Sequence, residues 1–234
     1  MNFHAKNKSA VFSLGLCCAC LTCAIAQNAG NFPTANQIIL KATAPYEDIA
    51  HYGVAKKDDK VVTYLADADA GMGEVMKILS PSEAREFENL RQKLHKAVVG
   101  KDRKTAADSS VTIFRMLVDR LNAKTLVVPK EVELLDFAGY KRAVLATADQ
   151  PDWQAISKLT DESDAWWKAI AMGVTDKHLR ATVTSAITGL KQSAEQKNLA
   201  MLLFGSQMIL DLVDMLEVGF KTAKASPAAP AAKP

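Results

Sequence analysis

Two pairs of side chains in this sequence are spaced to bind a metal ion. Glu47 and His51 stand four residues apart in a predicted helix, which places a carboxylate and an imidazole one turn apart on one face. Asp211 and Asp214, three residues apart in the last apolar segment, form a second pair of carboxylates. The metal-binding hypothesis is that these four residues bind a metal ion. The alternative is that they occupy solvent-facing helix surfaces, where acids and histidines are common.

Three methionines offer a different chemistry. Met201, Met208 and Met215 recur every seven residues, so they would lie near one helix face, and thioethers can bind copper(I). Core packing is the commoner use of methionine, and the sequence favours it here. No cofactor is predicted. The Cys-x-x-Cys-His motif is absent, which excludes covalently attached haem.

Catalytic signatures are missing from the chain. There is no Gly-x-Ser-x-Gly, no His-Glu-x-x-His and no phosphate-binding glycine loop. Trp153, Trp166 and Trp167 could line an aromatic ligand pocket, but indoles are also the largest fillers of a core, and we favour packing. The sequence therefore favours a non-catalytic protein over an enzyme.

The first 26 residues have the three parts of a secretory signal peptide. Lys6 and Lys8 make the start positive, an apolar stretch follows over residues 10–23, and Ala24-Ile25-Ala26 gives a cleavage site. The apolar stretch is shorter than the roughly 20 residues that span a bilayer. All four cysteines lie in this segment, so the mature chain has none. We expect a periplasmic or secreted protein.

Cleavage also changes the charge. Removing Lys6 and Lys8 lowers the basic residues from 29 to 27 against 26 acids, a net charge of +1. A nucleic-acid-binding protein should instead show a basic patch, so no nucleic acid is expected as a partner. The last apolar segment is interrupted by Gln207, Asp211, Asp214 and Glu217, and we therefore expect no stable membrane span in the mature chain.

Residues 27–222 are predicted to form an all-α multi-helix bundle, followed by a disordered Ala/Pro tail at 223–234. Ser80-Pro81 with Glu83 predicts a helix start with a capping box. Pro45 either starts a short helix or lies in a continuous one. A break is expected near Leu159, with Thr160 or Asp161 capping the next helix.

The bundle is predicted to contain two similar helical halves, 33–122 and 128–217. Sliding the chain by 95 positions pairs Leu117-Val118-Asp119 with Leu212-Val213-Asp214, and it also pairs the caps Ser80 and Thr175. The agreement of helix starts carries more weight than the few identities.

Two functional hypotheses follow. The first is an exported, non-catalytic binding or structural protein that contacts an envelope partner through a helix face. The second is a periplasmic bundle that binds a metal or small ligand through Glu47, His51, Asp211 and Asp214. No motif identifies a protein family.

Overall fold

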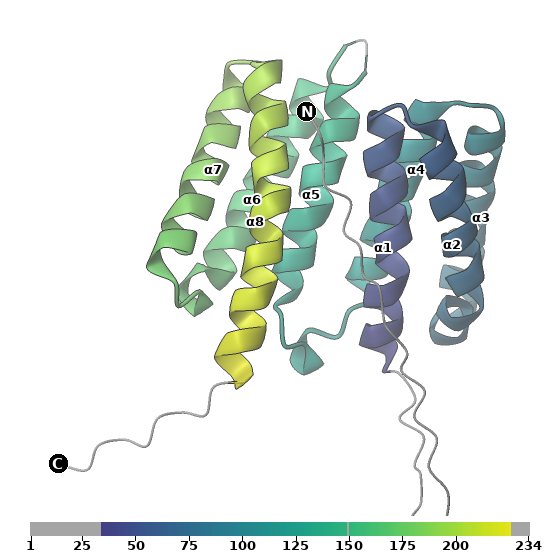
Figure 1. Cartoon of the computed structure of the whole chain (residues 1–234), viewed down its shortest axis with the longest axis horizontal. Coiled ribbons are helices and arrows are strands. Elements are labelled where there is room, and N and C mark those ends of the chain that lie inside the picture. Colours follow the sequence, from purple (N-terminus) through teal and green to yellow (C-terminus); the bar gives the residue numbers. More distant parts are fainter. Residues whose placement is uncertain (1–33, 149, 226–234) are drawn as a thin grey trace, which may run out of the picture. The chain divides into compact units, whose positions relative to one another are not determined.

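The computed structural model describes residues 34–148 and 150–225, and these residues form eight α-helices and no strand (Figure 1). The predicted all-helical bundle is confirmed for this part of the chain. The predicted signal peptide lies outside the described residues, as does the tail from residue 226. The helices are α1 (Ala35–Val54), α2 (Asp58–Ile78), α3 (Pro81–Val99), α4 (Arg103–Asp119), α5 (Lys130–Ala146), α6 (Trp153–Ile170), α7 (Lys177–Glu195) and α8 (Leu199–Ala225).

Side-chain caps set several of the helix starts. The predicted capping box of α3 is confirmed: the Ser80 hydroxyl accepts from the Glu83 backbone N–H, and the Glu83 carboxylate accepts from the Ser80 N–H at 2.8 Å. The cap of α7 is Asp176 and not Thr175, which the sequence comparison pairs with Ser80: the Asp176 carboxylate accepts from the N–H groups of His178 and Leu179. These caps satisfy backbone donors that the first helical turn leaves free.

The predicted break near Leu159 is wrong, because α6 runs unbroken from Trp153 to Ile170. The hydroxyls of Thr160 and Ser163 donate to backbone carbonyls four residues earlier, each at 2.8 Å. A residue that could cap a helix is thus satisfied inside one. Pro45 likewise lies within a continuous α1, and α8 extends to Ala225, three residues beyond the predicted end.

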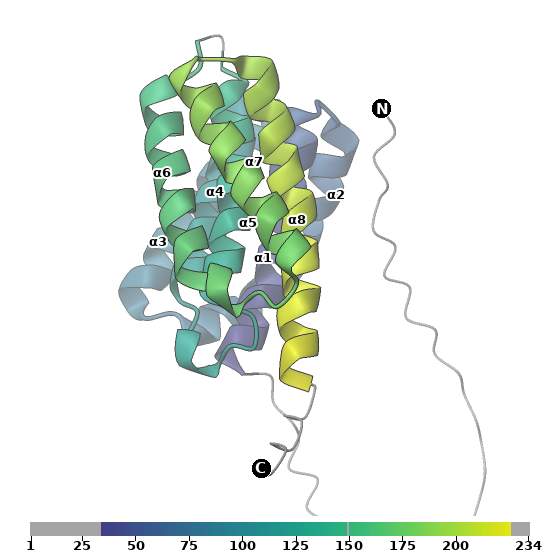
Figure 2. The ribbon, with the colours of Figure 1, turned by 90° about the vertical axis from the view of Figure 1, so that its left-hand side faces the viewer.

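The helices form two rings of four (Figures 1 and 2). Helices α1 to α4 contact one another in chain order, and α4 returns to contact α1; α5 to α8 repeat this arrangement. The first two helix starts of each ring are separated by 95 residues, and the other two by 96. The rings therefore share helix order, neighbours and nearly the same spacing.

Burial recurs at a spacing of 96 residues, one more than the spacing of 95 at which the sequence pairs the two halves. Five buried positions of α1 have buried counterparts 96 residues later in α5. The pairs are Asn36 and Val132, Ile39 and Leu135, Thr43 and Gly139, Tyr46 and Arg142, and Ala50 and Ala146. The two rings thus turn corresponding faces of their first helices inward.

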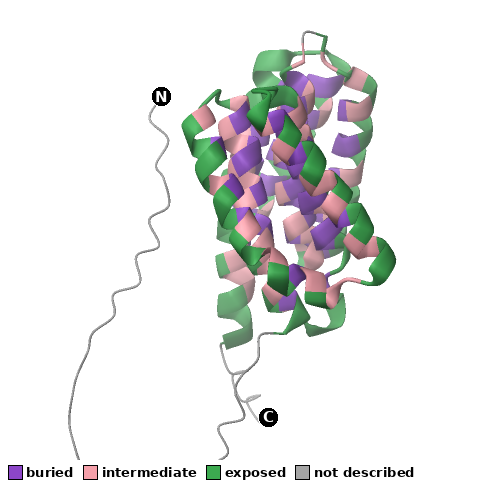
Figure 3. Cartoon of the chain, turned by 90° about the vertical axis from the view of Figure 1, so that its right-hand side faces the viewer, coloured by how far each residue is buried: buried purple, intermediate pink, exposed green. Residues whose placement is uncertain are grey.

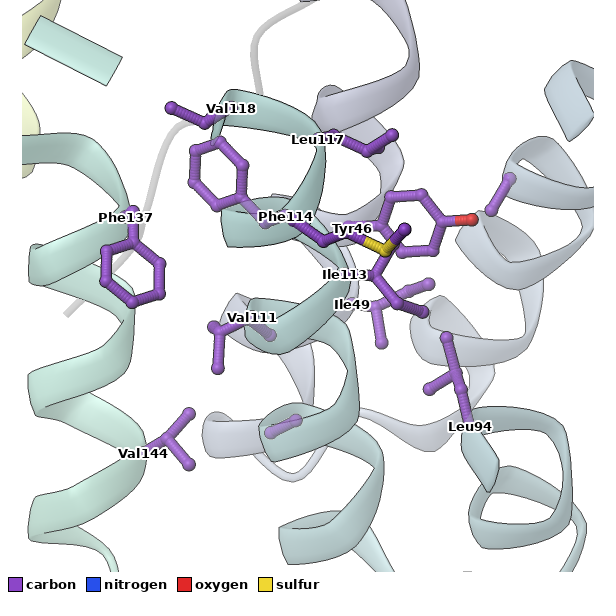
Figure 4. Close-up of a cluster of buried hydrophobic side chains, with 14 of the residues drawn as sticks. Tyr46, Ile49, Leu94, Val111, Ile113, Phe114, Leu117, Val118, Phe137 and Val144 are labelled. Carbon is purple, nitrogen blue, oxygen red and sulfur yellow. The ribbon is translucent and has the colours of Figure 1, made fainter. Parts of the chain in front are cut away.

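Helix α5 connects the rings through two apolar faces. Phe137 and Val144 point toward Phe114 and Val111 of α4 in the core of the first four-helix ring (Figure 4). The aromatic centroids of Phe114 and Phe137 lie 6.3 Å apart. Another set of α5 residues, which includes Leu135, belongs to the core of the second ring. Buried positions line these contacts, and exposed positions cover the outer faces (Figure 3).

Candidate functional site

The outer face of α8 carries apolar side chains that the described residues leave exposed. Met201, Phe204, Met215 and Val218 are 51%, 60%, 54% and 63% exposed, and Met208, between them, is partly buried. Their spacings of three, four and seven residues place all five on one side of the helix. We call these five residues the α8 stripe. Single exposed apolar residues are ordinary, but several of them on one side of a helix indicate a contact surface.

The rest of α8 belongs to the bundle. Its other face packs on α5 and α7, with Leu202, Ile209 and Val213 buried in the second core. Among the described residues, α8 is the one helix long and apolar enough to cross a membrane, and 33% of its most apolar window is buried inside the fold. Core helices of bundles meet the same criterion, so the length and composition of α8 fit a core helix as well as a membrane span.

Beside the stripe, carboxyl groups from three helices approach one another. Glu47 comes from α1, Glu133 and Asp136 from α5, and Asp214 and Glu217 from α8. We call these five residues the acidic cluster. Burial raises the pKa of Asp136 well above its usual range, and the negative charges of the other four members raise it further.

The same causes act on two more members of the cluster. Burial, followed by the charge of Glu133, raises the pKa of Glu47 to about 8. Burial, followed by the charge of Glu217, raises the pKa of Glu133 to about 7, although Lys221 opposes this shift. Lys221 also forms an ion pair with Glu217 at 2.6 Å. At neutral pH the cluster therefore retains protons. A positive charge nearby would lower the raised pKa values of its carboxyl groups.

The structure brings together two of the four predicted metal ligands. Glu47 and Asp214 both lie close enough to Asp136 for their charges to raise its pKa. Asp211 instead lies on the exposed side of α8, where it accepts a hydrogen bond from the Gln207 amide at 2.9 Å. Within residues 34–148 and 150–225, no group of three histidine, aspartate or glutamate side chains is arranged to hold a metal ion.

His51 has a different environment. Its ring packs edge-on against Tyr52 with centroids 4.9 Å apart, and burial, followed by the charge of Lys57, lowers its pKa. A neutral imidazole is the ligand form of histidine. The metal-binding hypothesis for Glu47, His51, Asp211 and Asp214 remains a prediction.

Sequence reasoning missed Glu133 and Asp136. They are three residues apart on one face of α5, a helix with apolar residues on both sides of them, and this pattern could have marked them. It could not have shown that α1 and α8 bring further carboxyls to the same place. The predicted packing of the methionines is also wrong in part, because Met201 and Met215 are exposed.

The tryptophans pack as predicted. Trp167 is buried in the second core and donates from its indole N–H to the Thr184 hydroxyl at 2.9 Å. The Trp166 indole lies 5.4 Å from the guanidinium of Arg115 on α4. This contact joins the two four-helix rings. The aromatic side chains thus serve packing in both places.

Arg142 is an uncommon feature of the second core, because it is fully buried. Its Nε donates to the Ser206 hydroxyl at 3.3 Å and its Nη1 to the Ser163 hydroxyl at 2.9 Å, while Nη2 has no partner among the described residues. Burial lowers its pKa to about 9. The side chain therefore remains cationic at neutral pH, without a carboxylate at ion-pair distance in the described chain.

Comparison with known proteins gives no relative: no protein-family model, no curated protein and no solved structure matches the chain. The α8 stripe and the acidic cluster are therefore the features of this chain that bear on its function.

Proposed function

We propose that the protein is an exported, non-catalytic binding protein that holds an envelope partner against the outer face of α8. The observation that carries this proposal is the α8 stripe, four of whose five members stay exposed although the opposite face of the helix is packed in the second core. Burying apolar side chains of this size releases about 25 cal/mol for each Å² removed from water. A partner that covers the stripe would gain this free energy.

The proposal includes the organisation of the chain. Residues 1–26 act as a cleaved signal peptide, so the protein works in the periplasm or outside the cell. Residues 33–122 and 128–217 are the two halves of a tandem duplication, which the common helix order and the recurrence of burial support. The Ala/Pro tail follows as a solvated segment.

Site-specific photo-crosslinking tests the proposed surface. A photoreactive residue at Phe204 should give one dominant adduct in native envelopes, because this side chain is the aromatic member of the stripe and is 60% exposed. The matched control is Thr182 on α7, an exposed position outside the stripe. The partner is then identified by mass spectrometry, and binding is reproduced with the two purified proteins.

The substitution Phe204→Ser should abolish this binding while leaving the helical circular dichroism and the melting temperature nearly unchanged, since exposed positions rarely affect stability by more than about 0.5 kcal/mol. Val62 on α2 is 57% exposed, so Val62→Ser provides the control for loss of an exposed apolar residue elsewhere. Equal adducts from positions 204 and 182 would contradict the proposal.

The second candidate function is binding of a metal or small ligand. The observation in its favour is that Glu47 and Asp214, two of the predicted ligands, meet in the acidic cluster. Elemental analysis and an absorption spectrum of natively purified protein test it directly. A stoichiometric metal or chromophore that is lost in Glu47→Gln would favour this function over the first.

A further inference from the structure

The α8 stripe has the length and shape that a second helix would need. It runs from Met201 to Val218, which corresponds to about 25 Å along the helix axis. Its members follow the three- and four-residue spacing by which one helix packs its side chains between those of another. An extended strand would instead require an exposed sheet edge, and the described residues contain no strand.

The charge next to the stripe is negative. Asp211 interrupts the row of apolar residues, and Asp214 is exposed at its margin, about 100° around the helix from Met215. Beyond Asp214 lies the rest of the acidic cluster, with Asp136 as the member on which the charges of the other four act. A helix that covers the stripe therefore places its flank beside carboxyl groups.

This charge distinguishes between occupants of the stripe. A helix that lies on a membrane surface usually carries lysine and arginine beside its apolar face, to pair with anionic lipids. Helix α8 carries Asp211 and Asp214 there, and its Lys221 is already paired with Glu217. Two copies of α8 packed along the stripe would place acidic residues beside acidic residues, which is unfavourable. A partner helix with basic residues beside its apolar face removes both conflicts.

We propose that the α8 stripe binds a cationic amphipathic helix of another protein, whose apolar face covers Met201 to Val218 and whose lysine or arginine side chains pair with Asp211 and Asp214. This inference rests on the proposed function and names the chemistry of the partner. The apolar contacts supply most of the affinity, and the carboxylates select the sign of the partner's charge.

Two model peptides of about 18 residues test the charge preference. Both are amphipathic helices with the same leucine face; one carries lysine on its polar face and the other glutamate. Binding of each labelled peptide to the full-length protein is measured by fluorescence anisotropy at low and high ionic strength. The lysine peptide should bind at least about tenfold more tightly at low salt, and added salt should reduce this difference.

Variants of the protein locate the interaction. Phe204→Ser should abolish binding of the lysine peptide, and Asp211→Asn with Asp214→Asn should weaken it by roughly tenfold without changing the binding of the glutamate peptide in the same direction. The control is Glu86→Gln, which removes an exposed acid from α3 in the other ring. It should leave both affinities unchanged, and an equal loss in this control would reveal non-specific charge attraction and overturn the inference.

Other outcomes separate the inference from the proposed function. Equal binding of both peptides through Phe204 would keep a helix-binding face but eliminate the charge preference. Failure of both peptides, together with an identified partner crosslinked at position 204, would also overturn the inference alone. Phe204-dependent binding to anionic vesicles, or a Phe204-dependent dimer in sedimentation, would assign the stripe to lipid or to a second copy. With neither peptides nor a crosslinked partner, the proposed function itself fails.

Discussion

Helices α4 and α8 close their respective rings, yet their surfaces are distributed in opposite ways. On α4, Val111, Phe114 and Val118 are buried and apolar, and Phe114 packs against Phe137 of α5. The positions 96 residues later in α8 are Gln207, Leu210 and Asp214, of which Asp214 is exposed.

The outer faces show the reverse. Thr112 and Asp119 of α4 are exposed and polar, as solvent requires, whereas the residues 96 positions later are Met208 and Met215. A helix that merely ends a repeated structure usually presents a polar outer face. The difference therefore teaches that α8 departs from a simple terminal helix on two sides, and that these two sides are the α8 stripe and the acidic cluster.

The largest expected effect separates the two helices by burial. Phe114 is fully buried on α4, so Phe114→Ala should lower the free energy of unfolding by about 3–5 kcal/mol, because it leaves a cavity at the junction of the rings. Phe204→Ala on α8 should change it by no more than about 0.5 kcal/mol. Urea denaturation of both variants measures the contrast. A comparable loss in Phe204→Ala would show that the stripe is covered within the protein, and the comparison would break.

A smaller effect is expected for the buried polar groups that contact α4 and α8. Ser110 of α4 donates to the Tyr46 carbonyl, and 96 residues later Ser206 of α8 accepts from Arg142. Replacing an uncompensated buried charge by an apolar side chain of similar length is often stabilising, so Arg142→Met should raise the free energy of unfolding by about 1–2 kcal/mol. Thermal denaturation should show the midpoint rising by a few degrees.

Tyr46→Phe is the matched variant in the first ring, since the Tyr46 hydroxyl has no partner among the described residues. It should be nearly neutral, because it removes a buried polar group that makes no hydrogen bond. A marked destabilisation of Arg142→Met would mean that the guanidinium charge is compensated in the folded protein, and this difference between the two rings would disappear.

The smallest expected effect concerns pH and the acidic face. The pKa of Glu47 is raised from 4.5 to about 8 in the folded protein, so the native state holds this proton more tightly than the unfolded state. Its contribution is therefore fully present below about pH 4.5 and is lost as the pH rises toward about 8. Glu47→Gln should flatten this loss and stabilise the protein by about 1 kcal/mol at the upper end of the range, less than the roughly 1.4 kcal/mol per pKa unit of a fully buried group, because Glu47 is only partly buried and solvent screens its charge.

Melting temperatures of wild type and Glu47→Gln across this pH range provide the measurement, with Glu86→Gln as the exposed control. The wild-type curve should fall more steeply than the Glu47→Gln curve. Parallel curves would indicate that neither burial nor the neighbouring carboxyls raise the pKa of Glu47, which would remove the acidic side of the comparison.

The sequence by itself determined the helices, because their signals are local. A cap such as Ser80 needs only a partner three residues away, and an apolar face needs only a regular spacing along one segment. The same local signal misled at Thr160, since a hydroxyl can bond to the carbonyl of the preceding turn as well as to a free N–H. The sequence also marked Glu47 and Asp214 as candidate metal ligands, but it did not mark Asp136, on which both of their charges act.

Only the tertiary structure decided which faces are covered. Both α4 and α8 carry apolar faces that the chain itself reveals, but Phe137 of α5 packs on Phe114 of α4, while Met201, Phe204, Met215 and Val218 of the α8 stripe remain exposed in the described residues. Glu47, Asp136 and Asp214 are separated by long stretches of sequence, and they interact because α1, α5 and α8 meet. Burial and pKa depend on distances between helices that no local spacing contains, and this is why the candidate site emerges only from the folded chain.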